Sequence, residues 1–108
     1  MDNEVIIQIG EVEYHFKLKS QKIVELEKLL GKNIFDIFAD MSFTSLRLIL
    51  SKCCLAPENA DPDQIMDDLM TKYSLIELAN DVVKDIAVKS GLLKQSQVDE
   101  ADAESKNA

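Results

Sequence analysis

Residues 5–16 read VIIQIGEVEYHF, and this stretch decides how the chain begins to fold. Apolar and polar residues alternate on both sides of Gly10-Glu11, which is the pattern of two β-strands joined by a two-residue loop. Glycine at the first central position of the loop favours a type II′ turn. The sequence therefore predicts a β-hairpin over residues 4–18 with an apolar face that packs on helices. The register set by this turn pairs apolar with apolar: Ile9 with Val12, Ile7 with Tyr14, and Val5 with Phe16.

Helical periodicity begins after the hairpin and continues to Gly91. Each expected helix starts at a residue type that caps helix N-termini, and Gly31 and Gly91 are expected to follow the ends of the first and last helices. Ser74 and Glu77 match a capping box, so a new helix is expected there, with a kinked continuation of the preceding helix as the alternative. The expected helices and their caps are 20–30 (Ser20), 34–39 (Asn33), 43–55 (Ser42), 62–73 (Asp61) and 75–90 (Ser74).

Together these patterns predict an α+β fold that is mainly helical. We expect a single domain over residues 1–93, in which the N-terminal hairpin packs on a bundle of four or five helices. Residues 94–108 are mostly Gln, Ser, Asp, Glu, Ala, Lys and Asn, with Val98 as the single branched aliphatic residue. Such a segment has little apolar surface to bury, so we expect a disordered acidic tail.

The charge balance of the chain excludes several kinds of partner. Lys and Arg number 12 against 20 Asp and Glu, which gives a net charge of -8. A chain this acidic repels phosphate groups, so we expect it to bind neither nucleic acid nor an anionic membrane. The first lysine is Lys17, and no charge-free apolar run is long enough to span a bilayer, so we expect no secretory signal and no membrane segment. The predicted location is the cytoplasm, where the adjacent Cys53 and Cys54 form a reduced, structural pair.

Residues with catalytic or metal-binding chemistry are few and badly spaced. His15 is the single histidine, and no Ser or Cys nucleophile lies at a recognisable spacing from it. An EF-hand loop that began at Asp61 would have Ile65 and Met66 at its fifth and sixth positions, where an oxygen ligand and glycine are required. The three glycines already have turn or cap roles, so no phosphate-binding loop is expected. We therefore predict a protein that is not an enzyme and that holds no metal or cofactor.

Two other functions fit parts of the sequence. An acyl carrier needs an exposed serine at a helix start for its phosphopantetheine arm, and Ser45 in Thr44-Ser45-Leu46, with Ser42 as a competitor, is the nearest match. An acidic protein that mimics nucleic acid and blocks a basic cleft would fit the net charge, although the acidic residues show no duplex-like spacing.

The order of segments resembles a known family. IVELEKLLG at 23–31 follows the hairpin, IFDIF at 34–38 comes next, and Ser42 then opens a leucine-rich helix before a loop and an acidic helix pair. Over residues 4–92 this pattern resembles the tail assembly chaperones of long-tailed bacteriophages and of prophages in Gram-positive bacteria. The resemblance implies a non-enzymatic protein that binds the tape measure protein and keeps it soluble until tail tube subunits polymerise around it. It also implies self-association, and it adds the tail tube protein as a second candidate partner.

A chaperone for an apolar client needs apolar surface to spare. The helical spacing predicts one buried stripe for each helix, such as Ile23, Leu26, Leu29 and Leu30 in the first helix and Leu75, Leu78, Val82 and Ile86 in the last. Apolar residues outside these stripes are candidates for partner binding, as is an isoleucine on the polar face of the hairpin. These candidates are Ile6, Leu48, Leu55, Ile76 and Val83.

Overall fold

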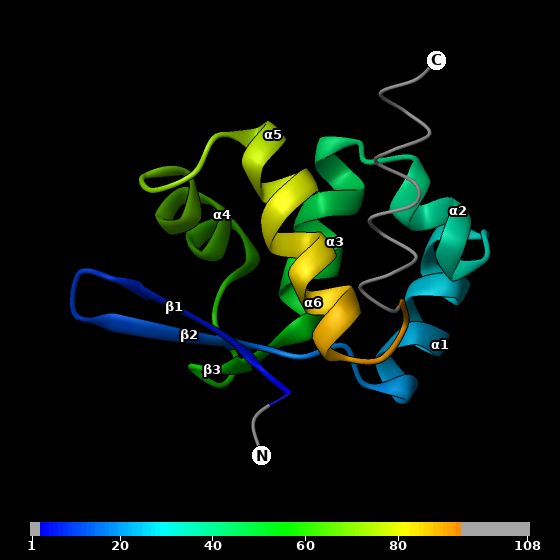
Figure 1. The fold of residues 1–108 in the computed structure, drawn as a ribbon, viewed down its shortest axis with the longest axis horizontal. Helices are drawn as coiled ribbons and strands as arrows, with labels where there is room; N and C mark the ends of the chain where they lie inside the picture. The colour runs from blue at the N-terminus through cyan, green and yellow to red at the C-terminus, as the bar shows by residue number, and fades with distance from the viewer. Residues whose placement is uncertain (1–2, 94–108) are drawn as a thin grey trace.

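The protein has the α+β architecture that its sequence predicts. A computed structural model describes residues 3–93, in which an N-terminal β-hairpin packs against a group of helices (Figure 1). The elements in chain order are β1 (Val5–Ile9), β2 (Val12–Phe16), α1 (Ser20–Leu30), α2 (Ile34–Ala39), α3 (Phe43–Cys53), β3 (Cys54–Ala56), α4 (Pro62–Met70), α5 (Leu75–Glu77), the π-helical turn η1 (Leu78–Val82) and α6 (Val83–Lys89). The predicted acidic tail at 94–108 lies outside the described residues.

The hairpin forms in the predicted register. Gly10 has a φ of 59°, and Glu11 is not among the described residues with positive φ, which is the combination that a type II′ turn requires. Burial is strong only at the end of the hairpin that lies against the helices, whereas Ile9 is half-buried and Val12 is exposed at the tip. The tip extends past the helices, as Figure 1 shows, so the turn fixes the register and the helices bury only part of the apolar row. The pairs are Val5 with Phe16, Ile7 with Tyr14, and Ile9 with Val12.

A third strand replaces the last turn predicted for the helix at 43–55. Helix α3 ends at Cys53, and Cys54–Ala56 pairs antiparallel with β2 to complete a sheet of order β1-β2-β3. The amide of Lys17 donates to the carbonyl of Cys53 at 2.9 Å, which joins the end of the helix to the sheet. Two effects favour the strand: Pro57 disfavours helical geometry at Ala56, and the second edge of β2 offers hydrogen-bonding groups that need partners. The helical prediction was therefore wrong for Cys54 and Leu55.

The helix starts agree with the sequence at four of five positions. Asn33, Ser42 and Asp61 each accept the backbone amide three residues later, and Ser74 with Glu77 forms a complete capping box. The Ser20 prediction was wrong, because Lys19 occupies the cap position and provides no side-chain hydrogen bond. At the other end, Gly91 has a φ of 86° and the Leu92 amide donates to the carbonyl of Ala87 at 2.9 Å, as a Schellman motif requires.

The last helical segment contains a π turn that the periodicity did not predict. Residues 75–89 run continuously through α5, η1 and α6, and η1 is widened by its i to i+5 hydrogen bonding. The extra residue in this turn changes the phase of the helix, so Val82 and Val83 are both buried. Leu75, which the straight helical pattern assigned to the buried stripe, is exposed instead.

A partly buried hydrogen bond joins the sheet to helix α4. The hydroxyl of Tyr14, a buried residue of β2, donates to Oδ2 of Asp68 at 2.5 Å. Burial, with the Asp68 carboxylate as a second cause, raises the pKa of Tyr14 well above its ordinary value, so the phenol remains a donor at all physiological pH values.

We expect Tyr14→Phe to lower the free energy of unfolding by about 1 to 2 kcal/mol, because it removes one hydrogen bond to a carboxylate and keeps the ring. Urea denaturation measures this loss. Tyr73→Phe is the matched control, since the half-buried Tyr73 ring lies beside Lys72 and the substitution preserves it. Equal stability of Tyr14→Phe and the wild type would contradict the contribution assigned to this bond.

His15 lies between two carboxylates on the solvent-facing side of the hairpin. Its Nδ1 is 2.8 Å from Oε1 of Glu4, and its Nε2 is 2.7 Å from Oε1 of Glu13. A neutral imidazole has one N–H and can donate to only one of the two, whereas the protonated ring donates to both. The hydrogen bonds to Glu4 and Glu13 therefore raise the pKa of His15 above its ordinary value.

Since the folded pKa of His15 is raised, its stabilising contribution is complete below the ordinary histidine pKa of about 6.5 and disappears as pH rises through the folded value. We expect the difference in Tm between the wild type and His15→Gln to be larger at pH 5.5 than at pH 8.5. Thermal melts at the two pH values measure it. A difference that does not change with pH would contradict the assigned role.

Candidate functional site

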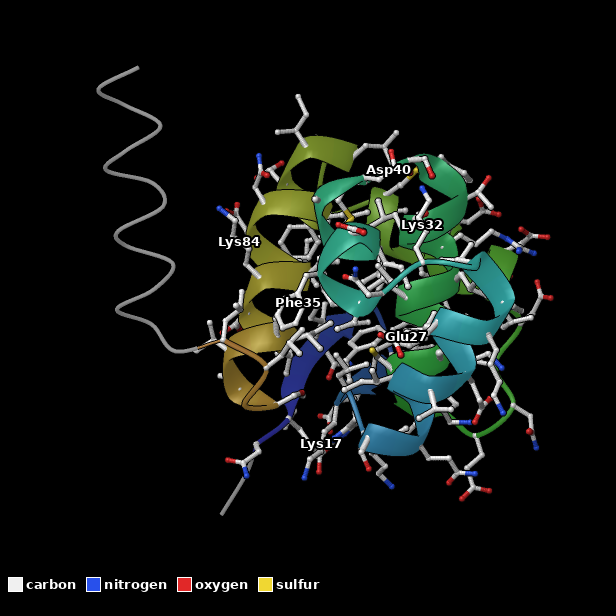
Figure 2. The ribbon with its side chains drawn as sticks, turned by 90° about the vertical axis from the view of Figure 1, so that its right-hand side faces the viewer. Lys17, Glu27, Lys32, Phe35, Asp40 and Lys84 are labelled. Atoms are coloured by element: carbon white, nitrogen blue, oxygen red, sulfur yellow. The ribbon has the colours of Figure 1, made fainter. Side chains whose placement is uncertain are left out.

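An apolar groove lies between α2 and the η1–α6 segment. Its volume is about 470 Å³, and Phe35 is the most exposed aromatic residue on its rim, with 60% of its surface accessible. Figure 2 shows Phe35 between α2 and the last helix, with Lys84 projecting from the opposite wall. Asn80 and Lys84 are the polar residues of the lining. The full lining is Phe35, Phe38, Ala39, Met41, Ala79, Asn80, Val83, Lys84, Ala87, Leu92 and Leu93.

The first wall of the groove follows from how a short helix buries its side chains. Ile34 and Ile37 of α2 point into the core, so the two phenylalanines next to them, Phe35 and Phe38, fall on the side that faces the last helix. Glu27 of α1 accepts the amide of Ile34 at 2.8 Å. The short helix α2 is therefore attached at its start to a longer helix.

A second contact holds the far end of α2. Lys32, just before the helix, pairs with Asp40, just after it, at 2.6 Å. Figure 2 shows both residues together with Glu27 around α2. The pair is about half exposed and stabilises the helix only weakly, but it orients the two ends of α2.

The second wall is built from the widened turn and the end of the last helix. Ala79 and Ala87 are small, so the helix backbone can form a shallow surface opposite the phenylalanines. The Schellman motif at Gly91 then turns the chain and places Leu92 and Leu93 at one end of the groove. Exposed carboxylates occur on both helices that form the walls: Asp36 on α2, Asp81 in η1 and Asp85 on α6.

The five candidate binding residues do not form one surface. Ile6 is 48% exposed on the hairpin and Ile76 is 72% exposed on α5, so both are available to a partner. Leu48 and Leu55 are half-buried, and Leu48 packs against the core. Val83 is fully buried beneath the floor of the groove, so its assignment as a spare surface residue was wrong. The phase change at the π turn explains this error, because it rotates Val83 toward the core.

Sequence reasoning missed the groove because its apolar residues come from segments far apart in the chain. One available signal was the composition of α2, in which four of six residues are Ile or Phe. A helix this short cannot bury all four on one face. Leu29 of α1 was assigned to a buried stripe and is instead 59% exposed, and it is not part of the groove lining.

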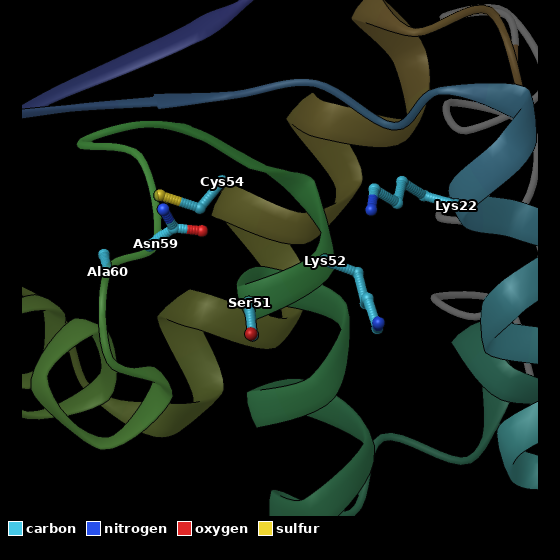
Figure 3. Close-up of a pocket in the computed structure, with 6 residues that line it drawn as sticks. All are labelled: Lys22, Ser51, Lys52, Cys54, Asn59 and Ala60. Carbon is cyan, nitrogen blue, oxygen red and sulfur yellow. The ribbon is translucent and has the colours of Figure 1, made fainter.

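A second, polar pocket of about 240 Å³ lies between α1, the end of α3 and the following loop. Figure 3 shows Lys22 and Lys52 on one side of it, with Cys54 and Asn59 on the other. Both lysines are within ion-pair distance of Glu25, at 3.4 Å for Lys22 and 3.0 Å for Lys52. The hydrogen bond from Lys52, with a smaller contribution from Lys22, lowers the pKa of Glu25. Glu25 therefore offsets one of the two lysine charges, which weakens but does not remove the attraction of the pocket for an anion.

The two cysteines and Ser45 are at least partly buried, whereas Ser42 is exposed at the start of α3. Burial raises the pKa of the Cys53 thiol to about 12 and also raises that of Cys54, so both are protonated at neutral pH. Ser45, the candidate for an acyl-carrier arm, is buried, and Ser42 accepts the Ser45 amide as a helix cap. Within residues 3–93, no three His, Cys, Asp or Glu side chains are grouped to hold a metal ion.

None of the helices in residues 3–93 is both long and apolar enough to cross a bilayer. Comparison with known proteins found no match: no protein-family profile, no curated protein sequence and no solved structure is significantly similar to this chain.

Proposed function

We propose that this protein is a non-catalytic chaperone of the phage tail assembly type, which binds the tape measure protein in the bacterial cytoplasm and keeps it soluble. The observation that carries the proposal is the open apolar groove between α2 and the last helix, on a body with a net charge of -8. The segment order that resembles this family provides the identity of the client. The protein acts by stoichiometric binding and needs no cofactor.

The groove has the chemistry expected of a site for an amphipathic helix. Its lining is aliphatic and aromatic apart from Asn80 and Lys84, so it offers few hydrogen bonds with which to orient a polar small molecule. Apolar side chains spaced at i, i+3 and i+4 on a client helix could instead contact Phe35 and the leucines at the end of the groove. An exposed phenylalanine beside an apolar cavity is the kind of residue that contributes most to such an interface.

The surrounding charge adds weak selectivity. The exposed carboxylates of Asp36, Asp81 and Asp85 lie on the two helices that form the groove walls. They attract Lys or Arg on a client helix, but the attraction is weak because Asp85 already pairs with Lys89 at 3.7 Å and Lys84 lies in the groove lining. The net negative charge also keeps the complex soluble, because two loaded molecules repel each other.

The binding site is tested with two variants, one in the groove and one outside it, whose substituted side chains are equally exposed. We expect Phe35→Ser to weaken binding to a purified tape measure fragment about 30-fold, which corresponds to an interface anchor of about 2 kcal/mol. Leu29→Ser is the matched control, because Leu29 is 59% exposed against 60% for Phe35 and does not line the groove. Isothermal titration calorimetry measures the two affinities, and circular dichroism checks that both variants fold.

Co-expression tests the function itself. The wild type and Leu29→Ser should raise the soluble fraction of the tape measure protein several-fold, and Phe35→Ser should not. If the tape measure protein is equally insoluble with and without the wild type, the chaperone proposal is wrong. If Phe35→Ser and Leu29→Ser both solubilise it fully, the client binds elsewhere on the protein.

A further inference from the structure

Strand β1 forms an open edge of the sheet. In the order β1-β2-β3, β1 has one neighbouring strand within the described residues. The Lys17 amide, directly after β2, donates to Cys53 on the β3 side. In a β-strand, the backbone N–H and C=O groups of successive residues point alternately to the strands on either side. The backbone groups of the odd-numbered residues of β2 therefore point toward β3, and those of its even-numbered residues point toward β1.

The same alternation fixes the direction of the backbone groups on β1. The partners of the even-numbered β2 residues are Val5, Ile7 and Ile9, so these residues hydrogen-bond within the hairpin. The N–H and C=O groups of Ile6 and Gln8 therefore point away from β2, toward the open edge. This edge is a ready template for another strand.

Within the described residues, the β1 edge lacks three of the features by which proteins prevent such pairing: proline, lysine and a bulge. Strand β1 contains no proline and no lysine, and the irregularity in the sheet lies on the other side, between His15 and Phe16. Ile6, the second of the five residues of β1, is 48% exposed, although it lies on the otherwise polar face of the hairpin. An isoleucine exposed on an open strand adds apolar surface that a partner strand could cover.

We propose that β1 pairs antiparallel with β1 of a second copy of this chain, about a two-fold axis at Ile6. This register places Ile6 against Ile6 of the other copy, Val5 against Ile7, and Glu4 against Gln8. The pairs around the axis are then apolar with apolar or carboxylate with amide, Ile9 lies opposite Asn3, and no two like charges face each other. The apolar face of one sheet continues into that of the other, so the strand is its own complement.

The charge of the protein gives this dimer a distinctive salt dependence. Each copy has a net charge of -8, so the two bodies repel each other, and the interface itself contains no ion pair between the copies. Added salt screens the repulsion and leaves the backbone hydrogen bonds and the isoleucine contact unaffected. Dimerisation should therefore strengthen as salt rises, whereas an interface built on salt bridges would weaken.

Sedimentation equilibrium tests the proposal on the full chain. We expect the wild type to approach twice its 12.1 kDa monomer mass, and more so at high salt, and we expect Ile6→Lys to remain monomeric. Val24→Lys is the matched control, since Val24 on α1 is 49% exposed against 48% for Ile6 and receives the same charge. The added positive charge lowers the repulsion in both variants, so a loss of dimer in Ile6→Lys alone can be assigned to the edge.

Amide hydrogen exchange provides a second test, which reports on the backbone of β1 directly and not on the oligomeric mass. In the wild-type dimer the amides of Ile6 and Gln8 should be protected, and in Ile6→Lys they should exchange at least tenfold faster. The Ile7 amide bonds within the hairpin and should be protected in both, which also shows that the variant folds.

A monomeric wild type at high salt, a dimeric Ile6→Lys, or unprotected Ile6 and Gln8 amides in the dimer would each overturn the proposal. None of these results depends on tape measure binding, so the edge and the groove are tested separately.

Discussion

Strand β2 hydrogen-bonds along both of its edges, and the position of the remaining elements depends on this pairing. On one side the Gly10 turn sets the register with β1, and on the other side the chain leaving α3 pairs with Phe16. Phe16 is completely buried as a result. A slip of one residue on either side would turn the apolar row toward solvent and remove the surface on which the helices pack. The last helix, and with it one wall of the groove, depends on that surface.

Much of this fold could be predicted because its signals are local. The turn at Gly10 and the caps at Asn33, Ser42, Asp61 and Ser74 depend on hydrogen bonds that span only a few residues. Strand β3 could not be predicted, because Cys54 leaves the helix to satisfy an edge of β2 that is distant in sequence. The π turn likewise depends on packing, since nothing in residues 78–82 distinguishes them from an ordinary helix. The groove depends on both local and long-range interactions: helix α2 and a helix over 75–90 were predicted, but the π turn that shapes the opposite wall was not.

The two proposed surfaces face different parts of the molecule. In Figure 1 the turn of the hairpin and α2 lie at opposite ends of the long axis, so the α2 wall of each groove is distant from the hairpin turn. A dimer that forms through β1 would present two binding grooves to one long client. Two weak contacts made by one assembly then act together, because the second contact forms at a high effective concentration once the first is made. A chaperone that must release its client can thus use weak individual sites.

The groove also has a consequence for the order of events during synthesis. Its walls come from residues 35–41 and residues 79–93, so the second wall ends about 50 residues after the first. At translation rates of about 5 to 20 residues per second, the first wall leaves the ribosome roughly 3 to 10 seconds before the second is complete. During that interval Phe35 and Phe38 have no opposing helix. A nascent molecule is therefore unable to engage a helix in this groove until almost the whole described domain has been made, which separates folding of the protein from capture of its partner in time.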